Sequence, residues 1–305
     1  MVDNIIEVRD FSKRYGTFVA VDELSFDVRE GDIFALLGPN GAGKTSTLEA
    51  MEGIRKCDGG SLKIAGFDPV SQSNKLRDVI GVQLQSGGLP EHITPAEAMA
   101  FFCAYHMVDV RTDLLDRMGL NEKKGAQFID LSAGQQRRLA LALAIAHNPK
   151  ILFLDEPTAG LDVASRRELH SLMQELKENG TTIILATHDM AEAEKMSDRV
   201  AILLRGKLAT IGTPMEITAT GAGLTKISVR SRDSKLIKTD AELPGVSKKN
   251  VHEEYAVYFS KEIGATIGVI LRKIEDEGDE LIDLRVERPS LEDRFLEITN
   301  EGGMK

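Results

Sequence analysis

The 305-residue sequence contains no long apolar segment. Its longest uninterrupted apolar run, residues 139–146, is far shorter than the roughly 18 residues that a bilayer-spanning helix needs. The chain opens with acidic and polar residues and has no basic stretch followed by an apolar one, so we expect no secretory signal. Any action on a membrane is therefore expected to pass through a partner protein.

Cysteine is scarce, and basic residues do not predominate. Cys57 and Cys103 are the only cysteines, without a CxxC or a paired Cys/His spacing, which indicates a reduced intracellular protein with two small structural thiols. The formal net charge of −10 argues against nucleic-acid binding, because neutralising phosphates requires a basic surface. The sequence also lacks internal repeats and low-complexity tracts, which excludes repeat architectures.

Several short apolar runs indicate strands that are buried on both faces. Residues 33–37, 151–154 and 182–186 are apolar without polar alternation, and a helical pattern over 164–177 lies between the last two. Such strands are typical of mainly parallel sheets covered by helices. The sequence therefore predicts an α/β protein, and its length is enough for about two domains.

The patterning changes twice along the chain. From about residue 88 to 147 helical spacing dominates, which predicts a helical insertion. After a glycine-rich linker at 220–223, strand-like and helix-like segments alternate, and Ser290 with Asp293 three residues later predicts the start of a final helix. We therefore expect one domain over 1–219 and a small α+β domain over 220–305.

A glycine-rich loop follows the first of the buried strands. Residues 38–45, Gly-Pro-Asn-Gly-Ala-Gly-Lys-Thr, satisfy the P-loop pattern GxxxxGK[ST] between a strand and a helix. Glycines let backbone N–H groups turn towards phosphate oxygens, and the helix that follows adds its positive N-terminal end. Lys44 is expected to reach the β- and γ-phosphates and Thr45 to supply a hydroxyl to Mg²⁺.

Two carboxylates end the strand over 151–154. A carboxylate at this position can bind Mg²⁺ opposite the P-loop, and we assign that role to Asp155. Glu156, one residue later, points elsewhere and is expected to polarise the attacking water as general base. Together with the P-loop, this pair predicts a P-loop NTPase.

Five further motifs narrow the class. They are Gln85 at the end of Ile-Gly-Val-Gln-Leu-Gln, the segment Leu-Ser-Ala-Gly-Gln over 131–135, Ala-Gly-Leu-Asp over 159–162, His188 in Ala-Thr-His-Asp, and Tyr15 in Arg-Tyr-Gly. In this order they resemble the Q-loop, signature, D-loop, switch histidine and adenine-stacking aromatic of the ATP-binding subunits of ABC transporters. The resemblance covers residues 4–213. It implies a P-loop NTPase core with a mainly parallel sheet, an antiparallel β subdomain and a helical insertion.

The resemblance also implies a set of site residues. Glu156, His188, Gln85 and Lys44 would be catalytic, and Thr45, Gln85 and Asp155 would hold Mg²⁺. The residues expected to contact ATP are Tyr15, Gly38, Pro39, Asn40, Gly41, Ala42, Gly43, Lys44, Thr45, Ser46, Ser132, Gly134, Gln135 and Asp162. In the family the signature residues contact ATP bound to the other subunit, which implies a second copy of the chain, here as a homodimer with two working sites. It also implies a membrane permease partner, with its coupling helix in a groove of the helical insertion, and a cytoplasmic protein on the inner face of the membrane.

One residue departs from the family pattern. Ala133 stands where the signature LSGGQ has its first glycine, and its methyl group would matter if that position required a positive φ or a close approach to phosphate. Ser132 and Gly134 are intact. We therefore expect a working site with a modest change in affinity.

The C-terminal tail bears on the direction of transport. Residues 288–296, Arg-Pro-Ser-Leu-Glu-Asp-Arg-Phe-Leu, resemble the ending of ATPases from drug-, antibiotic- and polymer-exporting ABC systems. An amphipathic helix that merely closes a small domain would look similar. The sequence thus favours an export motor. A non-transport ATPase or regulator and an importer motor remain the alternatives, and the transported substrate is not encoded in this chain.

Overall fold

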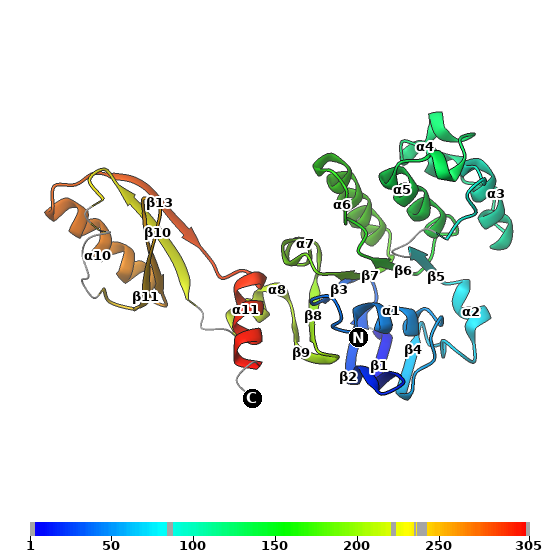
Figure 1. The fold of residues 1–305 in the computed structure, drawn as a ribbon, viewed down its shortest axis with the longest axis horizontal. Helices are drawn as coiled ribbons and strands as arrows, with labels where there is room; N and C mark the ends of the chain where they lie inside the picture. Colours follow the sequence, from blue (N-terminus) through cyan, green and yellow to red (C-terminus); the bar gives the residue numbers. More distant parts are fainter. Residues whose placement is uncertain (1–3, 84–87, 221–223, 235, 237–242, 303–305) are drawn as a thin grey trace. The chain divides into compact units, whose positions relative to one another are not determined.

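The computed structural model describes residues 4–83, 88–220, 224–234, 236 and 243–302 (Figure 1). The chain divides into two compact units, residues 1–214 and 215–305, which are treated separately below. The sequence-based boundary at 219/220 lies a few residues further along, after helix α8 (Pro214–Ala219), and the predicted linker residues 221–223 lie outside the described part of the chain. None of the helices within the described residues has both the length and the apolar character needed to span a bilayer.

The first unit is built on a six-stranded sheet. Its order is β5-β6-β7-β3-β8-β9, parallel except for the antiparallel edge strand β9. The strands are β3 (Ile33–Leu37), β5 (Ile80–Gln83), β6 (Ile151–Asp155), β7 (Thr182–Thr187), β8 (Arg199–Leu204) and β9 (Lys207–Gly212). All residues of β3, β6 and β7 are buried, as expected for central strands covered on both faces. The predicted α/β fold with a mainly parallel sheet is confirmed.

A second, antiparallel sheet completes the core of this unit. It has the order β2-β1-β4, with β1 (Asn4–Tyr15), β2 (Phe18–Arg29) and β4 (Gly59–Ile64). Its inward-facing residues, among them Phe11 and Leu24, share one hydrophobic core with Phe34 of β3 and Phe153 of β6. Helices α1 (Lys44–Met51) and α2 (Ser73–Arg77) belong to the same region. The antiparallel β subdomain is therefore present as expected.

Helices predominate between β5 and β6. Helices α3 (Pro95–Tyr105), α4 (Thr112–Arg117) and α5 (Ala133–Ala144) lie side by side (Figure 1). Two short 3₁₀ turns, Asn121–Lys123 and Phe128–Asp130, lie in the connection from α4 to α5. Two of these helices begin with reciprocal capping boxes, made by Thr94 with Glu97 and by Ser132 with Gln135. The helical insertion expected from the sequence is thus observed. Helices α6 (Val163–Glu178) and α7 (Met190–Met196) complete the unit.

The second unit is a small α+β structure. Its antiparallel sheet has the order β11-β12-β10-β13, with β10 (Thr225–Ser231), β11 (Val246–His252), β12 (Tyr255–Ser260) and β13 (Leu281–Glu287). Helix α10 (Ile263–Asp276) contributes Ile270 and Ile274 to a core shared with β10 and β12. The final helix, α11 (Leu291–Gly302), begins after Ser290, whose Oγ accepts a 3.1 Å hydrogen bond from the N–H of Asp293. The predicted N-cap is confirmed.

Candidate active site

Three strands of the large sheet end level with one another. Leu37 of β3 lies opposite Thr187 of β7, and Asp155 of β6 lies opposite Ala186 of β7. Because these strands are parallel, the segments that follow them all leave from one edge of the sheet. These segments carry the glycine-rich loop, the second carboxylate and the histidine that the sequence singles out. The topology therefore gathers residues that are up to 150 positions apart in the chain, from Gly38 to His188.

The glycine-rich loop needs glycine where it enters α1. Gly43, the N-cap of α1, has a φ of 100°, and a Cβ added there would lie 2.7 Å from the carbonyl oxygen of Ala20. A larger residue would therefore be strained by its backbone conformation and would also clash. The glycine leaves the N-terminal turn of α1 open to a negatively charged group.

Lys44 is buried at the start of α1. Its Nζ donates a 2.7 Å hydrogen bond to the carbonyl oxygen of Gly38 and a 3.3 Å bond to that of Pro39, and it lies 3.7 Å from Oε1 of Glu156. Burial lowers the pKa of Lys44, while the negative charges of Glu156 and Asp155 oppose that change. The ammonium group is thus held inside the loop that would surround the phosphates.

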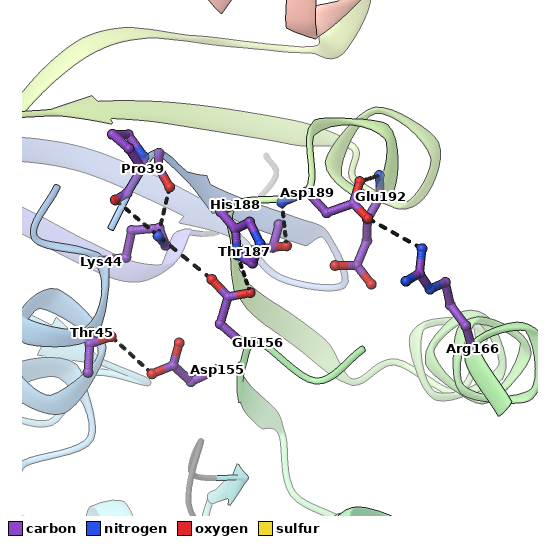
Figure 2. A network of polar contacts seen from close by, with 11 residues as sticks. Pro39, Lys44, Thr45, Asp155, Glu156, Arg166, Thr187, His188, Asp189 and Glu192 are labelled. Carbon is purple, nitrogen blue, oxygen red and sulfur yellow. Dashed lines mark hydrogen bonds and ion pairs between the residues drawn. The ribbon is translucent and has the colours of Figure 1, made fainter. Parts of the chain in front are cut away.

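Glu156 lies between two basic side chains (Figure 2). Its Oε1 faces Lys44, and its Oε2 lies 2.7 Å from Nδ1 of His188. The backbone of Glu156 has a φ of 49°, in the left-handed region, and its N–H donates a 2.9 Å hydrogen bond to the carbonyl oxygen of Ala186. Such a conformation costs about 1–3 kcal/mol in a non-glycine residue and is frequent at functional sites. His188 itself is 57% exposed, so its ring remains accessible to a ligand.

Thr45 and Asp155 form a pair of oxygen donors next to the loop (Figure 2). The hydroxyl of Thr45 donates a 3.1 Å hydrogen bond to Oδ2 of Asp155, while Oδ1 of Asp155 is buried without a partner among the described residues. Burial raises the pKa of Asp155, and the Thr45 hydrogen bond opposes this. A hydroxyl and a carboxylate with an unsatisfied oxygen are hard oxygen donors, the kind that Mg²⁺ prefers. The residues therefore fit a magnesium ion.

A pocket of about 180 Å³ is lined by the glycine-rich loop and its neighbours. We call it the phosphate pocket. Tyr15 at its rim is 40% exposed, and its hydroxyl lies 3.3 Å from Oγ of Ser46. The pocket is lined by Tyr15, Phe18, Ala20, Asn40, Gly41, Ala42, Gly43, Lys44, Thr45, Ser46 and Glu156. Most of the predicted nucleotide-contacting residues thus share one pocket, and Phe18 is an aromatic residue that the sequence reasoning did not select.

The signature residues serve in this chain as a helix start. Ser132 is the N-cap of α5, its Oγ accepts a 3.3 Å hydrogen bond from the N–H of Gln135, and Oε1 of Gln135 accepts a 2.9 Å bond from the N–H of Ser132. Ala133 is the first helical residue and is not among the residues with positive φ. Its backbone conformation is therefore one that alanine adopts without strain. A Cβ added at Gly134 would come no closer than 3.8 Å to Leu161.

The remaining predicted residues lie elsewhere. Asp162 is the N-cap of α6, and its Oδ1 accepts a 2.9 Å hydrogen bond from the N–H of Ser165. As far as the described residues show, Ser132, Gly134, Gln135 and Asp162 do not line the phosphate pocket. Gln85 lies outside the described residues.

Sequence reasoning missed Glu52, a buried carboxylate at the end of α1. The residue is 8% exposed, and its Oε2 has no hydrogen-bond partner in the described part of the chain. Burial, with smaller contributions from the negative charges of Asp155 and Glu49, raises the pKa of Glu52 from 4.5 to about 8. An isolated glutamate in a helix gives no sequence signal of burial. Its burial depends on the elements that pack around the C-terminal end of α1, eight residues after Lys44.

The raised pKa of Glu52 predicts a pH-dependent stability. The folded chain keeps this proton up to about pH 8, whereas the unfolded chain releases it near pH 4.5, so unfolding releases a proton between these values. The free energy of unfolding should therefore fall as pH rises through this window, by about 3 kcal/mol between pH 5.5 and pH 8. In Glu52→Gln this part of the decrease should disappear, as measured by urea unfolding at both pH values.

The exposed Glu178→Gln variant, on the last turn of α6, is the matched control and should keep the pH dependence of the original chain. Equal slopes of stability against pH in Glu52→Gln and the original chain would contradict the assignment of a buried neutral carboxyl group.

Fold and site together define a P-loop NTPase, since a parallel sheet presents a glycine-rich loop, its lysine and a strand-end carboxylate at one edge. The sequence profile described as "ABC transporter" matches residues 21–159. The daunorubicin resistance ATP-binding protein DrrA3 of Streptomyces coeruleorubidus is 32% identical over 310 residues, which cover 99% of this chain and 98% of that protein. The Nod factor export ATP-binding protein I of Burkholderia orbicola is 34% identical over 241 residues, covering 77% and 79% of the two chains.

Solved structures agree with these sequence relationships. The structure of an ATP-binding subunit of an ABC transporter superposes with a TM-score of 0.67 at 26% identity, covering 72% of this chain and 93% of that one. This chain therefore belongs to the ATP-binding subunits of the ABC transporter family, and the resemblance seen in its sequence is confirmed. As a family member it binds ATP and is an ABC ATPase, and subunits of this family work with membrane permease components.

Proposed function

We propose that this chain is the ATP-hydrolysing motor of an ABC exporter, in which two copies bind two ATP molecules and drive a separate membrane permease. The observation that carries this proposal is the position of Glu156 between Lys44 and His188, at the mouth of the loop that would hold the phosphates. A carboxylate so placed is within reach of a water molecule beside the γ-phosphate.

The hydrolysis step uses residues that the fold has already oriented. The oxygen of water bonds to the γ-phosphorus, the bond from that phosphorus to the bridging oxygen breaks, and the bridging oxygen leaves with ADP. Glu156 accepts the proton of the attacking water, while Lys44 and His188 offset negative charge on the phosphoryl oxygens. Thr45 and Asp155 would hold Mg²⁺, which supplies further charge neutralisation on the phosphates. Gln85 is proposed as an additional ligand and sensor of nucleotide on the basis of its motif.

Two copies of the chain are needed for a complete site in this proposal. Ser132, Gly134, Gln135 and Asp162 carry the family motifs for nucleotide contact, yet on the described residues they stand apart from the phosphate pocket of their own chain. A second copy would bring its signature helix α5 to the first copy's ATP. Tyr15 is the proposed platform for adenine, since it is half-exposed at the rim of the pocket.

A second cavity is the proposed binding site for the permease. This groove, of about 390 Å³, is lined by residues of β5 and of the helical insertion, including Phe102, Tyr105 and Leu143. Glu52, at the end of the P-loop helix, lines it as well, so a partner seated there would touch an element that begins at the phosphates. We propose that the permease inserts a short amphipathic helix in this groove.

Export is favoured by the relatives. The daunorubicin resistance protein matches this chain along nearly its whole length, including the second unit, and the tail over 288–296 resembles that of exporter ATPases. Localisation at the inner face of the membrane follows from binding to the permease.

Affinity purification from detergent-solubilised membranes tests the permease assignment. We expect one polytopic membrane protein to copurify with the chain, and ATP hydrolysis to rise when the two are reconstituted in liposomes. The variant Ala140→Arg, which places a charge in the groove, should lose this partner and still bind ATP. The exposed Lys75→Ala variant on α2 should keep it. Turnover that never depends on a membrane protein would favour a non-transport ATPase, and a requirement for an external binding protein would favour an importer.

A further inference from the structure

A third cavity lies in the first unit, between α6 and the helical insertion. It has a volume of about 370 Å³, within the range of roughly 300–1,000 Å³ that small-molecule pockets show. We call it the α6 pocket. Its apolar wall is formed by Met118, Leu141, Leu161, Leu169 and Leu172. None of its lining residues belongs to the phosphate pocket or to the groove proposed for the permease.

Arginines surround this apolar wall. Four of them, Arg117, Arg137, Arg138 and Arg167, line the pocket. Arg117 forms an ion pair with Glu175 on α6, whereas the other three have no carboxylate partner within the part of the chain that the structure describes. Unpaired guanidinium groups beside an apolar surface are available to an anionic ligand, which they can bind through two parallel hydrogen bonds.

The local charge is opposite to that of the whole protein. The pocket is lined by four arginines and two glutamates, Glu168 and Glu175, and therefore carries an excess of positive charge, whereas the chain has a formal net charge of −10. An acidic protein that keeps a positively charged, partly apolar cavity attracts small anions to that cavity in preference to the rest of its surface.

Two polar atoms at the pocket wall lack partners. Oε1 of Gln83, on β5, and Nε of Arg138, on α5, are buried and make no hydrogen bond to any described residue. A buried polar group without a partner costs about 1–3 kcal/mol. Nε of Arg138 could donate to an acceptor group of a ligand after a small rotation of the side chain, and a water molecule held beside that ligand could donate to Oε1 of Gln83.

We propose that the α6 pocket is a binding site for an amphipathic anion, with one carboxylate, phosphate or sulfonate group on an apolar body. The arginines would bind the anionic group, and the leucine-rich wall would bury the body. Inorganic phosphate offers nothing to the apolar wall, and a neutral apolar compound leaves the arginines unpaired. The pocket also includes Pro157 and Leu161, which belong to the loop between Glu156 and α6, so a bound ligand touches a segment next to the active site.

Fluorescence titration with 8-anilinonaphthalene-1-sulfonate, an aromatic sulfonate, tests this proposal on the full chain. We expect a saturable component of binding that weakens at least about tenfold in the double variant Arg137→Gln/Arg167→Gln, which removes two charged contacts. Ser171→Trp, at an exposed position on the rim, should abolish the same component by filling the pocket without a change in charge. Lys195→Gln, an exposed lysine of α7 outside the pocket, should leave it unchanged.

Competition distinguishes the possible sources of binding. Octanoate should displace the probe, whereas inorganic phosphate and 1-octanol at equal concentration should not. Displacement by phosphate alone would overturn the proposal in favour of a simple anion site, and equal displacement by 1-octanol would reduce it to an apolar surface. A titration without a saturable component, or with one that persists equally in the double variant and in Ser171→Trp, would also overturn it. Thermal unfolding of each variant verifies that the fold is retained.

Discussion

Replacing Glu156 by glutamine is expected to lower the rate of ATP hydrolysis by about 10²–10⁴-fold, the usual contribution of a general base, while ATP binding is retained. Glutamine has the same size and can still hydrogen-bond to His188, whose Nδ1 lies 2.7 Å from Oε2 of Glu156. It cannot accept the proton of the attacking water. Because ATP is then bound but not consumed, the variant should accumulate as an ATP-dependent dimer, seen by size-exclusion chromatography beside steady-state ATPase assays.

Glu178→Gln is the control for this substitution, because Glu178 ends α6 and lies outside the phosphate pocket. It should hydrolyse ATP at the rate of the unchanged chain and stay monomeric while turnover proceeds. Normal turnover in Glu156→Gln would remove Glu156 from the role of base. Loss of turnover without any dimer in ATP would contradict the two-copy arrangement and leave the base assignment intact.

Replacing Lys44 by alanine is expected to weaken ATP binding itself, by roughly 10–100-fold. The Nζ group of Lys44 is buried within the loop, and a hydrogen bond to a charged group contributes about 1.5–3 kcal/mol. The affinity is measured by titration with a fluorescent ATP analogue. This outcome differs in kind from that of Glu156→Gln, which keeps the ligand and loses the reaction.

Lys75→Ala, an exposed lysine on α2, removes the same charge from a surface away from the phosphate pocket and should bind ATP normally. Removing Lys44 also takes a basic neighbour away from the buried carboxylate of Glu156, which can lower the stability of the fold. Thermal unfolding of Lys44→Ala is therefore measured in parallel with the ATP titration. An unchanged affinity in Lys44→Ala would show that the lysine does not contact the phosphates.

The strands that position the site could be predicted because they are uniformly apolar. The runs at 33–37, 151–154 and 182–186 correspond to β3, β6 and β7, and each is followed directly by a residue of the site. The loop before Lys44 could also be predicted from a local signal, because few loops other than a P-loop have glycines at this spacing before a Lys-Thr pair. Such local signals need no knowledge of the tertiary structure.

Other elements were missed because their own residues carry little signal. Strand β11 (Val246–His252) contains two lysines and is mostly exposed, and it forms through its pairing with β12 at the edge of the sheet. Charged residues on edge strands discourage pairing with other chains, and they also obscure the strand in the sequence. Glu52 likewise looks like a surface glutamate until the neighbouring elements bury it.

By itself, the sequence determined the family of this protein and the residues that its site is predicted to use: a glycine-rich loop with Lys44, a carboxylate pair and His188. Only the tertiary structure decided which atoms meet, namely that Glu156 faces both Lys44 and His188 and that Thr45 pairs with Asp155. It also decided where the cavities lie, including the arginine-lined α6 pocket. The physical reason is that a motif depends on neighbours along the chain, whereas burial, charge pairing and cavities depend on how distant strands and helices pack.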